Sequence, residues 1–407
     1  INYYYFGYVI VGAPVLLLKM VPAFAYNLIL PTLFAAVGMG AFTVSFSVVA
    51  WLKRSRFAVP GSAWAAGIAA IFLVVVVGNL DTPRVALTGL ARMGGYVQPA
   101  GLEAFLIDEY VAAHDGNVPP DADLMAIAER VDASNPGDRM RYELAGAGEI
   151  VRSVSSGIGR VLAGDSLYIS PDRWFWGPSR VLAETPGVEG SAITEMPAFT
   201  FVYGDMHAHM ISMPMQLFVL AFVLSEILIV GSDKRGRVTR WLAIAAGAIV
   251  VGMLRATNTW DWITYILFGT LGLGFAWWLR WRTVGRWSLL DLIGRGGGFL
   301  AASALAVLPF TTWFATSYSS VRLWTDGKTP LWAYFDIHGL FLFLIVSLLL
   351  WETGRWLRGE KVGSLRGKGG WLLALIAFIL AAIAVAAALS LLGYQVVLIA
   401  LPLLVWV

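Results

Sequence analysis

Residues 210–254 read MISMPMQLFVLAFVLSEILIVGSDKRGRVTRWLAIAAGAIVVGML, two long apolar runs joined by a short basic connection. The first run, 210–231, is long enough to cross the hydrocarbon core of a bilayer as a helix, which takes about 20 residues. Short connections rich in lysine and arginine stay on the cytoplasmic side of a membrane. The stretch therefore predicts a transmembrane helical hairpin whose connection, 232–237, lies inside.

The rest of the chain repeats this apolar pattern. Of its 407 residues, 58% are hydrophobic and 14% are charged, and the mean hydropathy is +0.72. An ordinary soluble domain, which is about half apolar, could not bury that much apolar surface. Apolar runs that predict membrane spans lie at 23–50, 63–80, 210–231, 238–254, 259–279, 297–316, 333–352, 370–391 and 394–407. The predicted fold class is an all-α polytopic membrane protein.

Basic residues occupy the connections after the first, third, fifth and seventh of these runs. They are Lys53, Arg54 and Arg56; Lys234, Arg235, Arg237 and Arg240; Arg280, Arg282, Arg286 and Arg295; and Arg355, Arg358, Lys361, Arg366 and Lys368. A single topology places all four connections in the cytoplasm, as the positive-inside rule requires. The alternate connections are then expected on the extracytoplasmic face.

The longest of the outer connections, 81–209, is predicted to be a loop domain of its own. It carries 18 acidic against 9 basic residues, which agrees with an outer position. Amphipathic or mixed helical patterns lie within it at 84–95, 101–113, 122–133 and 139–162. Residues 1–80 precede it with an interfacial segment at 6–20 and two spans, and 210–407 follow as a bundle of about seven spans.

Composition excludes several function classes. The formal charge of +3 comes from basic residues scattered among hydrophobic segments, so we expect no nucleic acid as a partner. The chain has no cysteine, which excludes disulfides and thiolate chemistry. Neither a phosphate-binding loop, a dinucleotide fingerprint nor a nucleophile elbow is found. Because the sequence starts at Ile1 without an initiator methionine or signal segment, we expect further residues upstream.

The sharpest cluster of reactive side chains precedes the third span. Asp205, His207 and His209 are spaced two apart, so an extended or turn backbone can aim all three at one point. Carboxylate and imidazole are suitable ligands for a metal ion. Alternatively, the histidines cap the start of the helix and bond to its backbone. Both interpretations stay open on the sequence alone.

A second cluster lies in the short turn between the spans 238–254 and 259–279. It holds Arg255, Asn258 and Asp261. Charged residues at membrane depth are costly, so they usually pair with one another or line a water-filled site. A structural salt bridge between Arg255 and Asp261 is therefore the alternative to a functional role.

Two further motifs are found at predicted outer positions. Asp336 and His338 repeat the Asp-x-His spacing near the outer end of the span 333–352. Arg173, Trp176 and Arg180 bring two guanidinium groups beside aromatic rings, an arrangement suited to a phosphate or a sugar. An aromatic anchor at the interface with snorkelling arginines is the more ordinary explanation for this second motif.

Several of these segments, in this order, resemble the YYY family (DUF2298) of large bacterial and archaeal membrane proteins. They are Asn2-Tyr3-Tyr4-Tyr5-Phe6-Gly7, Trp176-Gly177-Pro178-Ser179-Arg180-Val181, Glu195 to His209, Asn258-Thr259-Trp260-Asp261 and His338-Gly339-Leu340-Phe341-Leu342-Phe343. The family typically has Gly-Asp-Leu-His-Pro-His where this chain has Gly204-Asp205-Met206-His207-Ala208-His209. The aspartate and both histidines are kept.

The YYY family is similar to C-type membrane glycosyltransferases, and this similarity implies a function. It implies a helical bundle of that type in a prokaryotic cell membrane, with membrane lipids and a polyprenyl-phosphate sugar as partners. Transfer would take place on the extracytoplasmic face. In such enzymes the catalytic base commonly lies in the first outer loop, which would here fall largely upstream of Ile1.

The roles expected from this resemblance fall on the clusters above. Asp205, His207 and His209 would bind a divalent metal, Mg²⁺ or Mn²⁺, or activate an acceptor hydroxyl. Arg180 and Arg255 would hold the lipid phosphate. The substrate-binding set expected in full is Arg173, Trp176, Arg180, Arg255, Asn258, Asp261, Tyr4, Tyr5, Asp336 and His338.

Two other function classes stay open. The chain is alternatively a non-enzymatic membrane subunit whose outer loop docks a protein partner and whose buried polar residues only hold helices together. It is alternatively a transporter, although the sequence lacks the paired, glycine- or proline-broken segments at mid-membrane that transporters ordinarily have.

Overall fold

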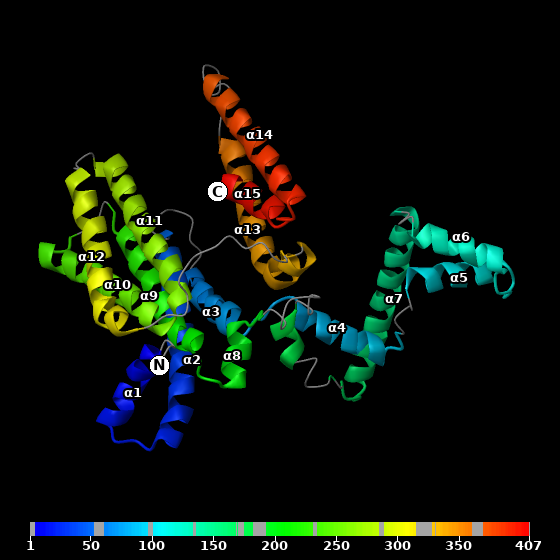
Figure 1. Ribbon diagram of the computed structural model, residues 1–407, viewed down its shortest axis with the longest axis horizontal. Helices are drawn as coiled ribbons and strands as arrows, with labels where there is room; N and C mark the ends of the chain where they lie inside the picture. The colour runs from blue at the N-terminus through cyan, green and yellow to red at the C-terminus, as the bar shows by residue number, and fades with distance from the viewer. Residues whose placement is uncertain are drawn as a thin grey trace. The chain divides into compact units, whose positions relative to one another are not determined.

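The computed structural model describes the helical framework of the chain (Figure 1). The described residues are 5–52, 61–96, 101–132, 136–167, 169, 175–181, 193–230, 234–284, 289–314, 328–329, 331–359 and 369–406. Throughout these ranges the regular structure is helical and contains no strand. The predicted all-α fold class is confirmed.

The chain divides into two compact units, each assembled from two separate stretches of sequence. The first comprises Ile1–Gly78 and Glu195–Asp326, and the second Asn79–Thr194 and Gly327–Val407. Helices of the first unit are α1 (Phe6–Leu17), α2 (Pro22–Leu52), α3 (Ser62–Val75), α8 (Pro197–Tyr203), α9 (Ala208–Leu228), α10 (Arg237–Thr257), α11 (Thr259–Val284) and α12 (Leu289–Trp313). Helices of the second are α4 (Asp81–Met93), α5 (Leu102–Ala113), α6 (Asp121–Asp132), α7 (Pro136–Leu162), η2 (Gly177–Arg180), α13 (Leu331–Gly359), α14 (Gly369–Leu391) and α15 (Val397–Trp406).

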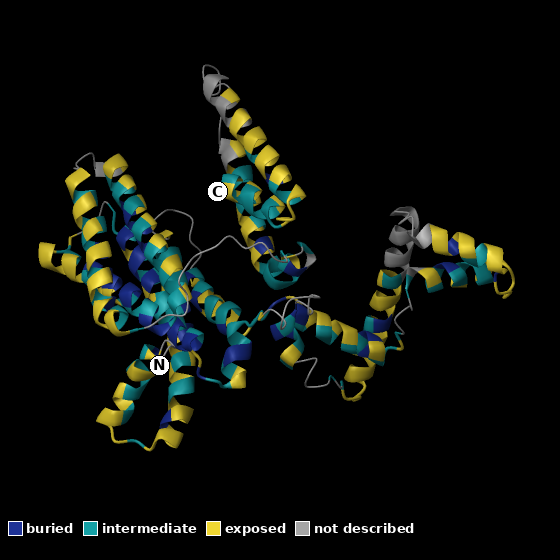
Figure 2. Ribbon diagram, viewed as in Figure 1, coloured by how far each residue is buried: buried dark blue, intermediate teal, exposed yellow. Residues whose placement is uncertain are grey.

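Six helices in the described part of the chain are long and apolar enough to cross a membrane. They are Pro22–Leu52, Ala208–Leu228, Arg237–Thr257, Thr259–Arg282, Leu289–Trp313 and Ala333–Arg355. Much of the surface of these helices is exposed, as the yellow ribbon of α12 shows (Figure 2). Large apolar residues are exposed there, such as Leu271 on α11 at 72% and Leu305 on α12 at 66%. Such surfaces suit contact with lipid. The prediction of an integral membrane protein is confirmed.

Two predicted spans correspond to helices that are shorter than expected. The apolar run 63–80 forms only α3, which ends at Val75, and the run 394–407 forms α15, which has 10 residues. After α3 the chain turns, because Asn79 and Leu80 bond to neighbouring segments. The Leu80 amide donates to the Asp336 carbonyl at 2.9 Å, and the buried Asn79 side chain donates to the Pro178 carbonyl at 2.6 Å. Apolar composition alone did not reveal this turn.

The core of the first unit lies among α9, α10, α11 and α12. Phe222 on α9 stacks on Phe299 on α12, with ring centroids 6.0 Å apart and an angle of 11° between the planes. Glycines let these helices approach closely: a Cβ at Gly252 on α10 would lie 2.5 Å from the Ser303 carbonyl on α12. The Ser303 hydroxyl in turn donates to the Ala248 carbonyl at 3.0 Å. Small residues and interhelical hydrogen bonds are the usual means of packing helices in lipid.

The outer-loop helices predicted from the sequence are present. The patterns at 84–95, 101–113, 122–133 and 139–162 form α4, α5, α6 and α7 with boundaries that differ by at most three residues. On α5 the Tyr110 hydroxyl donates to the Asp123 carboxylate on α6 at 2.9 Å, and this hydrogen bond raises the pKa of Tyr110. The hydrogen bond ties α5 to α6.

Helices α4 and α7 pack backbone against backbone. A Cβ at Gly157 on α7 would overlap the carbonyl group of Leu90 on α4, and a Cβ at Gly94 would overlap the carbonyl group of Ser153. Ala91 and Ser153 are buried at the same contact. Only glycine allows the backbones of the two helices to come this close.

We expect Gly157→Ala to weaken the packing of α4 on α7 by about 1–3 kcal/mol, because the new methyl group forces the backbones apart. Hydrogen–deuterium exchange of the α4 amides in the intact protein measures this as faster exchange. Gly159→Ala is the matched control, since a Cβ there meets nothing within 4 Å. The control should slow exchange in α7, because alanine favours a helix by about 0.5–1 kcal/mol over glycine. Equal behaviour of the two variants would contradict the close backbone contact.

Candidate functional site

The segment between α8 and α9 presents two of the predicted catalytic side chains. Helix α8 runs from Pro197 to Tyr203 and is capped by Gly204, whose φ of +71° is in the left-handed region that favours glycine. The chain then runs through Asp205 and Met206 to His207, the residue that precedes α9. The His207 amide donates to the Asp205 carbonyl at 2.8 Å, which closes a tight turn. We refer to residues 204–207 as the catalytic turn, after the role that the sequence predicts for Asp205 and His207.

Tyr26 on α2 holds the catalytic turn from the side. Its hydroxyl donates to the Gly204 carbonyl at 2.8 Å and accepts from the Met206 amide at 3.0 Å. The two hydrogen bonds bracket Asp205. Met206 is buried next to Leu30 and other residues of α2, so only the side chains of Asp205 and His207 turn outward.

Asp205 and His207 form an exposed acid and imidazole pair. The His207 Nδ1 lies 2.8 Å from the Asp205 Oδ2, and the two side chains are 49% and 46% exposed. A carboxylate on Nδ1 fixes the tautomer in which Nε2 is the proton acceptor. The pair is therefore suited to take a proton from a hydroxyl group that reaches Nε2.

His209 turns to different partners. Its Nε2 lies 3.3 Å from the buried Thr200 hydroxyl and 3.7 Å from Glu195 Oε2, while its ring lies 5.9 Å from that of His207. Across the part of the chain that the structure describes, no three histidine or carboxylate side chains are placed to hold a metal ion. As folded, the catalytic turn does not fit a preformed metal site. Metal binding by Asp205, His207 and His209 stays a prediction.

Asp261 joins the first turns of α9 and α11. Its Oδ2 accepts hydrogen bonds from Ser212 at 2.6 Å, Gln216 at 2.7 Å and Asn258 at 2.9 Å. Ser212 also donates to the backbone carbonyl of His209 at 2.9 Å. The network therefore connects the predicted turn 255–261 directly to the helix that carries His209.

Arg255 does not pair with Asp261. Its guanidinium lies over the ring of Trp262, with 4.9 Å between Cζ and the ring centroid. Within the described ranges it forms no ion pair, so the salt bridge considered from the sequence is not formed there. A half-buried guanidinium on an aromatic face keeps its charge and its donors for a ligand. Tyr5 lies at this end of the bundle too, with its ring 5.7 Å from that of Phe310.

The remaining predicted site residues belong to the second unit or lie outside the described residues. Arg180 lies over the ring of Trp176 at 4.7 Å and donates to the Ser179 carbonyl at 2.8 Å. The Asp336 carbonyl accepts from Leu80, and the His338 ring lies 4.8 Å from that of Tyr334. Tyr4 and Arg173 lie outside the described residues.

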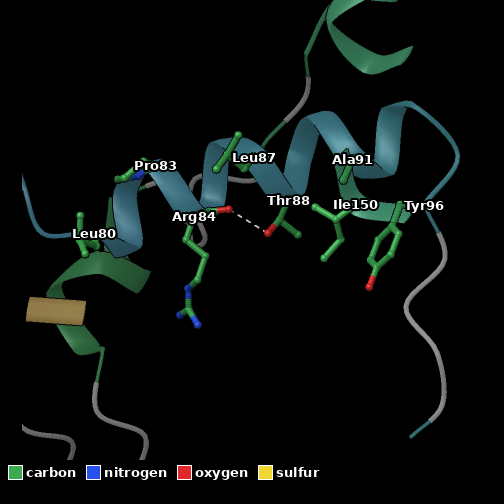
Figure 3. A pocket seen from close by; sticks show the side chains of 8 residues that line it. All are labelled: Leu80, Pro83, Arg84, Leu87, Thr88, Ala91, Tyr96 and Ile150. Atoms are coloured by element: carbon green, nitrogen blue, oxygen red, sulfur yellow. Dashed lines mark hydrogen bonds between the residues drawn. The ribbon is translucent and has the colours of Figure 1, made fainter. Parts of the chain in front are cut away.

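The second unit also contains an apolar cavity that the sequence did not indicate. It measures about 300 Å³ and lies between α4 and α7 (Figure 3). Its lining residues are Leu80, Pro83, Arg84, Leu87, Thr88, Ala91, Tyr96 and Ile150. Arg84 is paired with Asp81, and Thr88 bonds to the Arg84 carbonyl at 2.8 Å. Apart from Arg84, which is paired with Asp81, the side chains that line the cavity are uncharged.

Sequence reasoning missed three residues of the first unit. Ser212 and Gln216 lie one helical turn apart in an otherwise apolar span, and that polar pair was the available signal. Tyr26 gave no signal, because its two partners lie 178 and 180 residues away in the chain. Only the packing of α2 against the catalytic turn reveals its role.

We expect Tyr26→Phe to loosen the catalytic turn, because the Gly204 carbonyl and the Met206 amide lose their common partner. A loss of about 1 kcal/mol corresponds to roughly fivefold faster exchange of the Met206 amide. Amide exchange measured on the intact protein checks this. Tyr5→Phe is the control, since the Tyr5 ring keeps its contact with Phe310. Unchanged exchange of the Met206 amide in Tyr26→Phe would mean that the Tyr26 hydroxyl does not hold the catalytic turn.

Comparisons with known proteins identify a family but no activity. The family described as "Uncharacterized membrane protein (DUF2298)" matches residues 1–407. No curated protein and no solved structure matches the chain.

Proposed function

The chain belongs to the DUF2298 family of uncharacterized membrane proteins, and within it we propose a membrane glycosyltransferase. In this proposal a sugar passes from a polyprenyl-phosphate donor to an acceptor hydroxyl on the extracytoplasmic face. The observation that carries the proposal is the exposed Asp205–His207 pair at 2.8 Å, located in the same unit as the ion-pair-free guanidinium of Arg255. A proton acceptor and an anion-binding group are the two parts that such a transfer needs.

The first part of the reaction is activation of the acceptor. The acceptor O–H gives its proton to His207 Nε2, and the oxygen attacks the anomeric carbon of the donor sugar. Asp205 stabilises the imidazolium that forms and keeps the ring oriented. Tyr26 keeps both side chains directed outward by holding the backbone between them.

The second part is departure of the lipid phosphate. The bond between the anomeric carbon and the phosphate oxygen breaks, and its electron pair leaves with the phosphate. The Arg255 guanidinium stabilises this charge through charge-assisted hydrogen bonds. Because the catalytic turn does not fit a preformed metal site, we assign no step to a metal ion.

The other predicted substrate residues have supporting roles in this proposal. Asn258 and Asp261 hold the turn that carries Arg255, while Tyr5 offers an aromatic ring to the sugar. Arg180 with Trp176, and Asp336 with His338, belong to the second unit and remain predicted substrate-binding residues. The outer location follows from the basic connections that the positive-inside rule assigns to the cytoplasm.

A non-enzymatic subunit is the second candidate function. It is favoured by Asp261, whose Oδ2 is fully engaged by Ser212, Gln216 and Asn258, as expected of a purely structural tie. In that case the second unit would dock a protein partner, and Asp205 and His207 would only order the start of α9.

Sugar transfer in membrane vesicles that contain the protein tests the proposal. Radiolabelled polyprenyl-phosphate glucose and mannose serve as probes, and the measurement is loss of label from the lipid fraction to product. We expect His207→Gln to lower the rate by about 10²- to 10⁴-fold, the usual contribution of a general base. Asp205→Ala should lower the transfer rate less, because His207 Nε2 remains as the proton acceptor. Arg255→Gln should weaken donor binding about 10- to 100-fold, as loss of a charged hydrogen-bond donor does.

His114→Gln and Arg92→Gln are matched controls, since both residues are exposed in the second unit, Arg92 on α4 and His114 directly after α5. They should transfer sugar at the unsubstituted rate. Undiminished transfer by folded Asp205→Ala and His207→Gln proteins would remove the catalytic turn from the reaction. No transfer from either probe above background would favour the non-enzymatic subunit.

A further inference from the structure

Helix α7 has two apolar faces, and only one of them packs on α4. The packed face contains Ser153 and Gly157, which lie against the α4 backbone. The residues next to it around the helix recur at spacings of one, three and four, which places them together on a second face. They are Ile150, Val151, Val154, Ile158, Val161 and Leu162, and we call them the apolar side of α7.

The apolar side of α7 is largely exposed. Val151 is 70% exposed, Leu162 83% and Ile158 44%. A helix on the surface of a soluble domain ordinarily turns polar residues to water. A contiguous apolar patch instead marks a contact with a protein or a membrane. The apolar side of α7 therefore indicates a contact beyond the described part of the chain.

The opposite side of α7 is polar. Glu149, Arg152, Ser156 and Arg160 recur there at spacings of three and four, and all four residues are exposed. A helix that has one apolar side and one polar side with arginines is the type that lies in the surface of a bilayer. Such a helix buries its apolar side by about 5–10 Å in the boundary between the headgroups and the acyl chains.

Contacts with α13 place the start of α4 at the end of a membrane span. The apolar span within α13 begins at Ala333. The Leu80 amide donates to the carbonyl of Asp336, which lies about 5 Å along the helix from that end. A Cβ at Gly339, about one turn further along, would lie 2.5 Å from the Leu80 side chain. The start of α4 is therefore at the depth where an interfacial helix lies.

The apolar cavity between α4 and α7 joins this depth to the apolar side of α7. Leu80 lines one end of the cavity, and Tyr96 and Ile150 line the other end (Figure 3). Ile150 belongs to the apolar side of α7 as well. The volume of about 300 Å³ is at the lower end of the range for sites that bind a small molecule. Because Arg84 is paired with Asp81, the cavity suits a hydrocarbon chain better than a charged group.

We propose that the apolar side of α7 and the cavity beside it lie on the bilayer surface at the end of α13, in contact with the hydrocarbon chains of membrane lipids. The two helices α4 and α7 then lie outside the hydrocarbon core, and the polar side of α7 faces water. Continuity with a span that itself suits lipid favours lipid over a protein as the partner. The side chains of this surface take no part in the proposed sugar transfer, so the contact with lipid would stand without that activity.

Helices α5 and α6 provide a contrast within the same unit. They also expose apolar side chains, with Val118 in the connection between them at 75% and Met125 on α6 at 69%. Residues 102–132, however, carry eight acidic residues and one basic residue. That excess of negative charge opposes contact with an anionic bilayer surface. We therefore expect α5 and α6 to face water.

Spin labels on single cysteines test the contact, because the chain has no cysteine of its own. The intact protein is studied in vesicles of phosphatidylcholine and phosphatidylglycerol. Labels at Val151→Cys and Ile158→Cys should be relaxed several times more by oxygen, which concentrates in hydrocarbon, than by a water-soluble nickel complex. Ser156→Cys, on the polar side of the same helix, is the matched control and should show the reverse. Leu271→Cys on α11 and Val118→Cys are the lipid and water references.

Two results would overturn the proposal. If the nickel complex reaches Val151 and Ile158 as readily as Ser156, the apolar side of α7 faces water. If the labels at Val151 and Ile158 are shielded from both reagents, a second copy of the chain or another protein covers the apolar side instead of lipid.

A phosphatidylcholine with a photoactivatable diazirine in its acyl chain repeats the test on the unsubstituted protein, so that the folding of a variant cannot decide the outcome. After irradiation, mass spectrometry should locate lipid adducts on residues 150–162 and on Tyr96, and none on residues 118–125. Absence of adducts from residues 150–162, when α11 carries them, would overturn the contact. Adducts on residues 150–162 but not on Tyr96 would overturn the part of the cavity and leave that of α7.

Discussion

The hydrogen bonds that Asp261 accepts are the interaction on which the end of the bundle that carries the catalytic turn depends. In the apolar part of a membrane a charged or polar side chain has no water to bind, so it must find its partners within the protein. Ser212 and Gln216 on α9 and Asn258 before α11 meet that requirement with three neutral donors. Because the partners come from α9 and from the turn between α10 and α11, satisfying one carboxylate also fixes the helix ends that carry His209 and Arg255.

Glycines set the closest helix-to-helix contacts in both units. Lipid chains are as apolar as leucine, so burying leucine against leucine gains little in a bilayer. In the first unit Gly252 lies against the Ser303 backbone. In the second unit Gly157 on α7 lies against the Leu90 backbone on α4. The same device serves α4 and α7, which lie in the loop that we expect outside the membrane. Rigid, closely spaced helices hold the exposed side chains of the catalytic turn at fixed positions.

The sequence predicted helices well where a single periodic pattern decides them. The run 101–113 became α5 over 102–113, and the run 238–254 became α10 over 237–257. The prediction from sequence was wrong where a distant contact decides the structure. Residues 76–80 leave the helix because Asn79 and Leu80 bond to segments about 100 and 256 residues away in the chain. The candidate residues of the catalytic turn were identified by type and spacing. Two partners were not identified: Tyr26, which bonds to the catalytic turn, and Ser212, which bonds to Asp261. Only helix packing brings these residues to their partners.

Two carboxylates that contact or belong to α9, Asp261 and Glu226, obtain their compensation from different kinds of group. Glu226 is buried, and it takes its compensation from Arg235 and Arg295. Asp261 takes its compensation from neutral donors. Arg255 therefore does not serve as the counter-charge of Asp261, and its guanidinium lies over the ring of Trp262 instead. Had Arg255 paired with Asp261, its charge would be compensated within the protein, so the neutral partners of Asp261 leave Arg255 available for the phosphate-binding role that we propose for it.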